Sequence, residues 1–233
     1  MSNVLNIGLE GRFKFTAVRP DGSERVLADW HQNLILDSGL NQIGTGVCWD
    51  RCQVGTGTTA PDEGQTALAA PLATTTTIWG TTGGTNTPTN TYAWVQRVYR
   101  FGVGVAAGDL TEVGVGWAAG LFSRTLIKDS GGIPTSITVL ADEYLDVTYE
   151  IRAYPTMTDQ TFSGVDISGT PYTFTVRPGQ FSGNESSSGT WPADLSAMMN
   201  AGVTGVGGTS FGLSAYGSGA ALAAVTGSIS GTQ

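Results

Sequence analysis

Charged side chains are scarce in this chain, because Asp, Glu, Lys and Arg make up only 13% of its 233 residues. An ordinary globular domain carries about twice that share. Thr, Ser, Gly and Asn must therefore cover much of the surface. Such surfaces occur on secreted β proteins and also where protein packs on protein, since the centres of interfaces are depleted in charge. The composition favours a chain that assembles with other proteins.

Basic residues are the rarer sign of charge. The chain has 11 Lys and Arg against 19 Asp and Glu, which gives a formal net charge of −8. Lys14 and Lys128 are its lysines. Nucleic acid binding needs a basic face, and anionic lipid attracts runs of Lys and Arg that this sequence lacks. We therefore expect no nucleic acid partner.

Long apolar runs are lacking as well. No window approaches the roughly 18 apolar residues of a membrane span, and Met1–Gly11 has neither the basic start nor the apolar core of a secretory signal. We expect no membrane insertion, and a protein that is made in the cytoplasm and stays there until it assembles. The two cysteines fit this interpretation, because small secreted scaffolds usually carry more.

Residue types that carry chemistry are also few. Cys48 and Cys52 are separated by three residues, whereas redox pairs use two and zinc sites need four ligands. Two small buried residues and a local disulfide both remain open for them. His31 is the sole histidine, and no Gly-x-Ser-x-Gly motif accompanies it. These patterns predict no enzyme activity, no catalytic residue, no metal and no cofactor.

Acidic residues gather at two places, Asp142, Glu143 and Asp146 before a strand and Asp62 and Glu63 in a loop. Paired carboxylates can act as general acid and base or bind calcium. Adjacent residues on a strand point to opposite faces, so Asp142 and Glu143 are not expected to converge. We predict solvated turns at both places and keep a polysaccharide hydrolase that uses Asp142 and Asp146 as an alternative.

Two glycine pairs, Gly55-x-Gly57 and Gly102-x-Gly104, partly match phosphate-binding loops. Neither continues into the Lys-Ser/Thr of a nucleotide site or the third glycine of a dinucleotide site, so turns are predicted. Aromatic residues near the strands are expected mainly in the core, with stacking on sugars as the alternative for any that are exposed. These residues are Trp79, Tyr92, Trp94, Tyr99, Trp117 and Trp191.

Alternating apolar and polar residues predict an antiparallel β-sandwich domain over residues 1–155, with one buried and one wet face on each strand. A turn at Pro20–Ser23 joins the first two strands, because Pro presets its own φ and Gly accepts a positive φ. The expected strands are Arg12–Val18, Arg25–Trp30, Cys52–Gly55, Tyr92–Phe101, Leu110–Trp117, Leu121–Ile127, Ile137–Ala141 and Leu145–Ala153.

Three other segments of this domain follow different patterns. One short helix is expected within Asn33–Gly44, with Asp37-Ser38 as its cap and Gly44 as its end, although Gly39 inside it is unfavourable. A turn of helix is expected in Thr66–Leu72. Thr74–Asn90 is rich in Thr, Gly and Asn, and we interpret it as an exposed excursion whose Trp79 packs on a neighbour.

Residues 156–233 are predicted to form a smaller, Gly/Ser/Thr-rich β domain for assembly or attachment. A strand is expected at Tyr172–Val176, a loop at Gly183–Gly189 and a short helix at Pro192–Asn200. Small residues dominate Gly202–Gln233, which therefore gains little hydrophobic free energy alone. We expect this segment to form strands only by packing on the rest of the chain or on a neighbouring chain.

Six segments occur in a recognisable order: Asn33-Leu-Ile-Leu-Asp-Ser-Gly-Leu40, Val54-Gly-Thr-Gly-Thr-Thr-Ala-Pro61, Thr66-Ala-Leu68, Arg100-Phe101, Leu110-Thr-Glu-Val-Gly-Val-Gly-Trp117 and Leu121-Phe122-Ser-Arg124. Together they resemble virion proteins encoded among the tail genes of tailed bacteriophages, over roughly residues 10–155. The resemblance implies a β-rich component of the tail tip, baseplate or tail fibre that works as a homo-oligomer and supports host attachment. Its segments are structural, so no active-site residue is carried across.

The expected partners are copies of the chain itself and other tail or virion proteins, with a host surface receptor as a further partner, and the expected location is the virion. Low-charge surfaces and edge strands would make the contacts, since unpaired backbone groups on an edge can pair with an adjacent subunit. The alternatives are a receptor-binding fibre or spike protein and a capsid decoration protein. The position in the virion, the oligomeric state and the receptor stay open.

Overall fold

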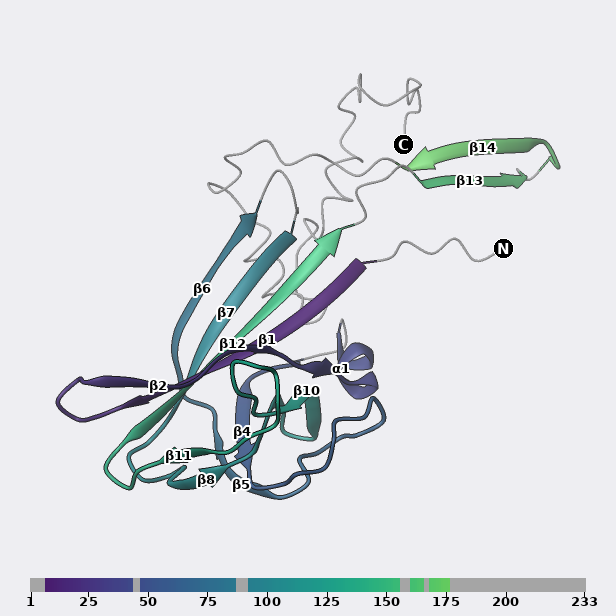
Figure 1. Ribbon diagram of the computed structural model, residues 1–233. Coiled ribbons are helices and arrows are strands. Elements are labelled where there is room, and N and C mark those ends of the chain that lie inside the picture. Colours follow the sequence, from purple (N-terminus) through teal and green to yellow (C-terminus); the bar gives the residue numbers. More distant parts are fainter. Residues whose placement is uncertain (1–6, 44–46, 87–91, 156–159, 166–167, 177–233) are drawn as a thin grey trace.

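The computed structural model of the chain describes residues 7–43, 47–86, 92–155, 160–165 and 168–176. In this part of the chain, two five-stranded antiparallel sheets pack face to face, and one short helix packs on the smaller sheet (Figure 1). The mainly β, antiparallel sandwich predicted from the sequence is confirmed. No helix within the described ranges is long and apolar enough to cross a membrane.

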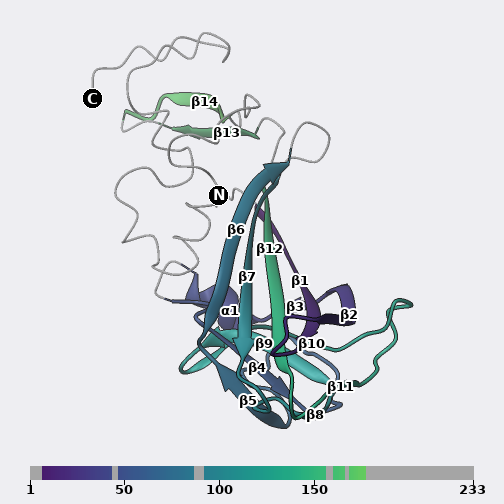
Figure 2. The ribbon, with the colours of Figure 1, turned by 90° about the vertical axis from the view of Figure 1, so that its left-hand side faces the viewer.

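The larger sheet has the strand order β2-β1-β12-β7-β6. Strands β1, β12, β7 and β6 run well beyond the smaller sheet, as Figures 1 and 2 both show. Because β2 and β6 stand at the ends of this order, they are the two edges of the sheet. The strands are Glu24–Gln32 (β2), Ile7–Val18 (β1), Tyr144–Pro155 (β12), Tyr92–Phe101 (β7) and Ile78–Asn86 (β6).

The smaller sheet has the order β3-β10-β9-β4-β5, and two further pairs of strands lie outside both sheets. The pairs are β8 with β11 and the hairpin of β13 with β14. The strands of the smaller sheet are Leu34–Ile35 (β3), Gly120–Leu126 (β10), Glu112–Trp117 (β9), Arg51–Gly55 (β4) and Pro71–Thr75 (β5). Those of the pairs are Gly108–Leu110 (β8), Ile137–Val139 (β11), Gln160–Val165 (β13) and Pro171–Val176 (β14).

The core lies between the two sheets and follows the predicted alternation on β1 and β12. Phe13 of β1 packs on Tyr149 of β12 with ring centroids 4.7 Å apart, and Trp49 meets the same tyrosine edge to face at 5.6 Å. All three side chains are fully buried. Burial of a large apolar side chain contributes about 1.5–3 kcal/mol, so this cluster joins the sheets firmly.

Strands β9 and β10 are buried on both faces, which corrects the prediction of one wet face on each strand. The predicted pattern holds for their inner residues, but Glu112 and Arg124 are buried on the other side. The reason is that α1 (Asp37–Gln42) packs on β10, and the loop between β4 and β5 is bonded over the outer face of β9. The periodicity of β9 and β10 does not reveal that a helix and a loop cover them.

The helix lies within the predicted range but begins differently. Leu36 is its N-cap and makes no side-chain capping bond, so the predicted Asp37-Ser38 cap is wrong. Ser38 instead donates its hydroxyl to the carbonyl of Leu121, at 2.8 Å. A Cβ on Gly39 would lie 2.3 Å from the carbonyl oxygen of Phe122. Gly39 therefore permits the close approach of α1 to β10, despite its cost in a helix. The helix ends at Gln42, and Gly44 lies outside the described residues.

The Thr-rich segment after the β4–β5 loop differs most from its prediction. Residues 71–75 pair with β4 and residues 78–86 pair with β7. The turn of helix expected in Thr66–Leu72 is therefore wrong. The excursion expected from Thr74 is mostly exposed over its described residues, as predicted, but it is made of paired strands and not of a loop. Thr is a good strand former, and the backbone bonds of this segment are supplied by β4 and β7. Residues 87–91 lie outside the described part.

The second part is described only as far as residue 176. β12 ends at Pro155, and β13 and β14 form a hairpin that contains the predicted strand at Tyr172–Val176. β13 was not predicted, because Gly and Ser interrupt its alternation. Gly183–Gly189, Pro192–Asn200 and Gly202–Gln233 lie outside the described residues. A separate 156–233 domain stays a prediction.

Candidate assembly interface

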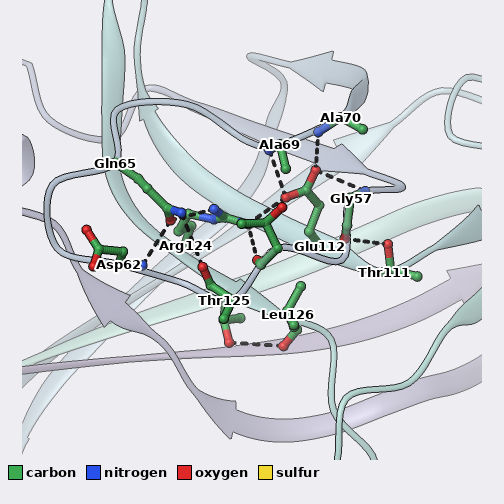
Figure 3. A network of polar contacts seen from close by, with 12 residues as sticks. Gly57, Asp62, Gln65, Ala69, Ala70, Thr111, Glu112, Arg124, Thr125 and Leu126 are labelled. Carbon is green, nitrogen blue, oxygen red and sulfur yellow. Dashed lines mark hydrogen bonds and ion pairs between the residues drawn. The ribbon is translucent and has the colours of Figure 1, made fainter.

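A buried ion pair lies beneath the loop that leads to the Thr-rich strands. Glu112 on β9 and Arg124 on β10 lie diagonally on the same face, and the Arg124 Nη2 to Glu112 Oε2 distance is 2.7 Å (Figure 3). Their side chains are only 0% and 1% exposed. Such a pair is costly to desolvate, and it is stable only when further hydrogen bonds satisfy both groups.

The remaining bonds of the pair all go to the β4–β5 loop. Glu112 accepts backbone N–H bonds from Gly57 at 3.1 Å, Ala69 at 3.0 Å and Ala70 at 2.7 Å. Arg124 donates to the Gln65 side chain and to the carbonyl of Thr59. The ion pair thus holds residues 57–70 against the outer face of the smaller sheet (Figure 3).

The Gly55-x-Gly57 pair is explained by this arrangement. The Gly57 N–H donates to the carboxylate of Glu112 at 3.1 Å, and the Thr56 N–H donates to the carbonyl of Ala70 at 2.9 Å, so both groups are bonded within the chain. A Cβ at Gly57 would lie 2.5 Å from Glu112 Oε1. Gly57 is therefore needed for contact with this carboxylate. Gly104 of the second pair has a φ of +72°, and the Val105 N–H donates to the carbonyl of Gly102 at 3.0 Å, as expected of a turn.

The loop at residues 57–70 leads directly into β5, and β6 follows on the same side of the sandwich. β5 is an edge of the smaller sheet and β6 is an edge of the larger sheet, and only Thr76 and Thr77 separate them. We call residues 71–86 the Thr-rich edge. No charged residue and no histidine occurs from Gly64 to Gln96. Two neighbouring sheet edges therefore carry no charge.

The other edges are protected in the usual ways. β2 carries Glu24, Arg25 and Asp29, and its pairing with β1 contains two register shifts. β3 is only two residues long. Charges, bulges and short length are the devices that prevent pairing of a sheet edge with another chain.

β6 has little of this protection. It is nine residues long, contains no proline, and shows a register shift only near Ile78. Exposed apolar side chains lie along the Thr-rich edge, namely Leu72, Ile78 and Trp79. Trp79 is 64% exposed. A long, uncharged edge with exposed apolar residues is open to pairing with another strand.

The outer face of the larger sheet is polar and internally bonded. Glu150 of β12 pairs with Arg12 of β1 at 2.8 Å and with Arg152 at 2.6 Å, and it also accepts a bond from Gln96 of β7. Burial raises the pKa of Glu150, but these bonds outweigh it and hold the pKa below its usual value. The arginines and carboxylates of this face thus bond one another across the strands.

Trp79 joins this face at the start of β6. The Arg100 guanidinium lies 4.0 Å from the centroid of the Trp79 ring and forms a two-pronged ion pair with Asp146, at 2.7 and 2.6 Å. Bonding to Asp146 raises the pKa of Arg100. Most of the Trp79 ring stays open to solvent, and the expectation that this segment packs on a neighbour stays a prediction.

The residues considered as candidates for chemistry, Cys48, Cys52 and His31, are all buried. Cys48 and Cys52 are buried and form no disulfide. Burial raises the pKa of Cys48 to about 12 and that of Cys52 well above its usual value. His31 is buried, stacks on Phe15 with centroids 5.7 Å apart, and has Nδ1 2.9 Å from the carbonyl oxygen of Asp29. Burial lowers the pKa of His31.

The acidic clusters have separate partners. Glu143 is almost fully buried and pairs with Arg25 at 2.9 Å, so the predicted solvated turn is wrong at this residue, although Asp142 beside it is exposed. Asp146 instead bonds Arg100. Asp62 and Glu63 are exposed in a turn, as predicted, and Asp62 accepts a bond from the N–H of Gly64 at 3.0 Å.

The candidate aromatic residues divide by exposure. Tyr99 is in the core and bonds the carbonyl of Trp49, while Tyr92, Trp94 and Trp117 are half-buried. Trp191 lies outside the described residues. Sequence reasoning missed Glu112 and Arg124 as partners; a charged residue within each of two strongly apolar strands was the available signal.

Comparison with known proteins identifies no relative: no family model, no curated protein and no solved structure matches the chain.

Proposed function

We propose that this chain is a structural subunit of a tailed-bacteriophage virion, in the tail tip, baseplate or tail fibre, and that it assembles with copies of itself and other virion proteins. It does no bond-making chemistry in this role. The phage assignment rests on the resemblance of the six segments in residues 10–155. The assembly role rests on the geometry of one side of the sandwich.

The observation that supports assembly is the contrast between the two edges of the larger sheet. β2 carries Glu24, Arg25 and Asp29, whereas β6 carries no charge. Loss of edge protection exposes a monomer to non-specific aggregation, so it is compatible with a soluble chain when a specific partner covers the edge. The buried pair of Glu112 and Arg124 holds the loop before this edge against the smaller sheet.

A second candidate function is binding to a receptor on the host surface. The observation in its favour is Trp79, an exposed ring beside the ion pair of Arg100 and Asp146. Exposed aromatic rings stack on sugars, and Trp, Tyr and Arg are the residues that dominate binding energy at protein interfaces. Binding of the purified protein to host cells, and its loss in Trp79→Ala, would separate this function from pure assembly.

The direct experiment is to purify tailed particles from a host that carries the gene and to measure their protein content by mass spectrometry. A gold-labelled antibody against the chain then locates it on the particle. We expect several copies per particle and label on the tail. Label on the head would favour a capsid decoration protein, and absence from particles would exclude a virion role.

A further inference from the structure

We propose that two copies of this chain pair through β6, antiparallel and about a two-fold axis, so that their larger sheets become one continuous sheet. This inference rests on the proposed function and deepens it, because it names the partner and the geometry of one assembly contact. The backbone of strand Ile78–Asn86 makes the proposed contact.

The first step is the open hydrogen-bonding side of β6. β6 pairs with β7 over most of its length, from Ile78 opposite Tyr99 to Asn86 opposite Tyr92. On its other side no strand of the described ranges pairs with it. Alternate N–H and C=O groups of its nine residues therefore point outward, and an added strand gains main-chain bonds along the whole edge.

The second step is the choice of partner. In a symmetric antiparallel pair, each residue lies opposite another residue of the same strand. A charged strand would place like charges close together in some registers, and like charges opposite each other are destabilising. β6 has no charge, and several of its residues are Thr, which pair well across strands. A different protein partner would ordinarily be selected by complementary charge, which β6 does not offer.

The third step is the place of the exposed apolar residues. Ile78 and Trp79 lie at the start of β6, and the side chain of Trp79 is the more exposed of the two. If Thr82 lies on the axis, residue 79 of one copy is opposite residue 85 of the other. The two tryptophans then flank the seam, one at each end. Burial of both rings adds apolar area to a contact otherwise made by backbone.

Two lysine variants test the pairing in the full chain. Thr82→Lys puts a charge in the middle of β6, and Val26→Lys puts the same charge on the exposed surface of the opposite edge, β2. Sedimentation velocity over a range of concentrations measures self-association. We expect Thr82→Lys to raise the Kd for self-association about tenfold or more, a difference of about 1.4 kcal/mol or more. Val26→Lys should leave it unchanged.

A cysteine scan gives a second measurement that does not depend on the stability of the lysine variant. Thr81→Cys, Thr82→Cys and Gly83→Cys are each oxidised, and disulfide-linked dimers are counted on a denaturing gel. The residue nearest the axis faces its own copy and should cross-link best, while Val26→Cys should not. Cys48 and Cys52 are buried and give little background.

Several results would overturn the inference: a full chain that is monomeric at all concentrations, equal effects of the two lysine variants, or no cross-link at any of the three β6 positions. The outcome is independent of the particle experiment. A chain found in tails but unaffected by Thr82→Lys keeps the proposed function and loses this contact. A chain that cross-links through β6 but is absent from particles keeps the contact and loses the function.

Discussion

Glu112 and Arg124 form the contact at which three of the six sequence segments meet. Val54–Pro61 supplies the Gly57 N–H and the Thr59 carbonyl, Leu110–Trp117 supplies Glu112, and Leu121–Arg124 supplies the arginine. These three segments supply the ion pair and two of its further hydrogen bonds; Gln65, Ala69 and Ala70 supply the others, and Arg124 Nε is buried without a hydrogen-bond partner.

Removal of one partner of this pair should destabilise the protein strongly. Arg124→Met leaves the Glu112 charge buried without its cation, which typically costs about 3–5 kcal/mol. The free energy of unfolding in urea measures the loss. The matched control is Arg51→Met, because the pair of Arg51 and Asp50 is 25% and 43% exposed and should contribute less than about 1 kcal/mol. Equal losses in the two variants would contradict the role given to the buried pair.

Two alanine variants in the same loop test the close contact at Gly57. Gly57→Ala places a methyl group 2.5 Å from Glu112 Oε1 and 2.7 Å from the Cβ of Ala69, so we expect a loss of about 1–3 kcal/mol from overpacking. Gly64→Ala meets only the Asp62 carboxylate, at an ordinary 3.4 Å, and should change stability by less than about 0.5 kcal/mol. If urea unfolding finds Gly57→Ala as stable as Gly64→Ala, the loop is not held as described.

Stability should fall between pH 7 and pH 5 because of His31. Burial lowers its pKa in the folded protein below the ordinary value of 6.5, so the unfolded chain takes up a proton first as the pH falls. The contribution of neutral His31 is therefore fully present above pH 6.5 and is lost as the pH falls towards the folded-state pKa. The thermal midpoint, measured at several pH values, should decline over this range.

His31→Phe is the control for that pH dependence. It keeps a ring against Phe15 and removes the titrating group, and the chain contains no other histidine. The variant should have a flat stability profile from pH 7 to about pH 5, where carboxylates such as Glu150 and Glu143 begin to matter, since their pKa values are also lowered. An unchanged slope in His31→Phe would assign the pH dependence to other groups.

Both native cysteines should resist alkylation in the folded protein. The thiolate is the reactive form, and burial raises the pKa of Cys48 to about 12. Mass spectrometry after iodoacetamide treatment at pH 8 should find Cys48 and Cys52 unmodified in native protein and modified in denatured protein. Val26→Cys, on the exposed surface of β2, supplies an exposed thiol as the positive control. Reaction of native Cys48 as fast as this thiol would show that its site opens readily.

The strands of the larger sheet could be predicted from the sequence because their local pattern matches their environment. β12 alternates Leu, Val, Tyr, Ile and Ala with polar residues, and one of its faces is the core while the other is polar. The turn at Pro20–Ser23 is local too, and Gly22 has the expected positive φ of 85°. The turn depends only on residues that are neighbours in sequence, and the strand depends only on one face being buried and the other polar.

The Thr-rich edge and the buried ion pair could not be predicted in the same way. β5 and β6 lack large alternating side chains, so their strand structure comes from pairing with β4 and β7, which local pattern does not reveal. Glu112 and Arg124 stand at positions that alternation assigns to solvent. They are buried because a loop more than 40 residues distant from Glu112 in sequence, at Ala69 and Ala70, covers them.

Hydrogen exchange of the β6 amides tests the central claim, that this chain completes its structure against copies of itself, most directly. The measurement compares concentrated wild-type protein with Thr82→Lys and follows the β6 amides that do not bond to β7, with β2 as reference. The account predicts slow exchange along β6 in the concentrated wild type, fast exchange in Thr82→Lys, and no difference in β2. Equal exchange of β6 in both proteins would contradict it.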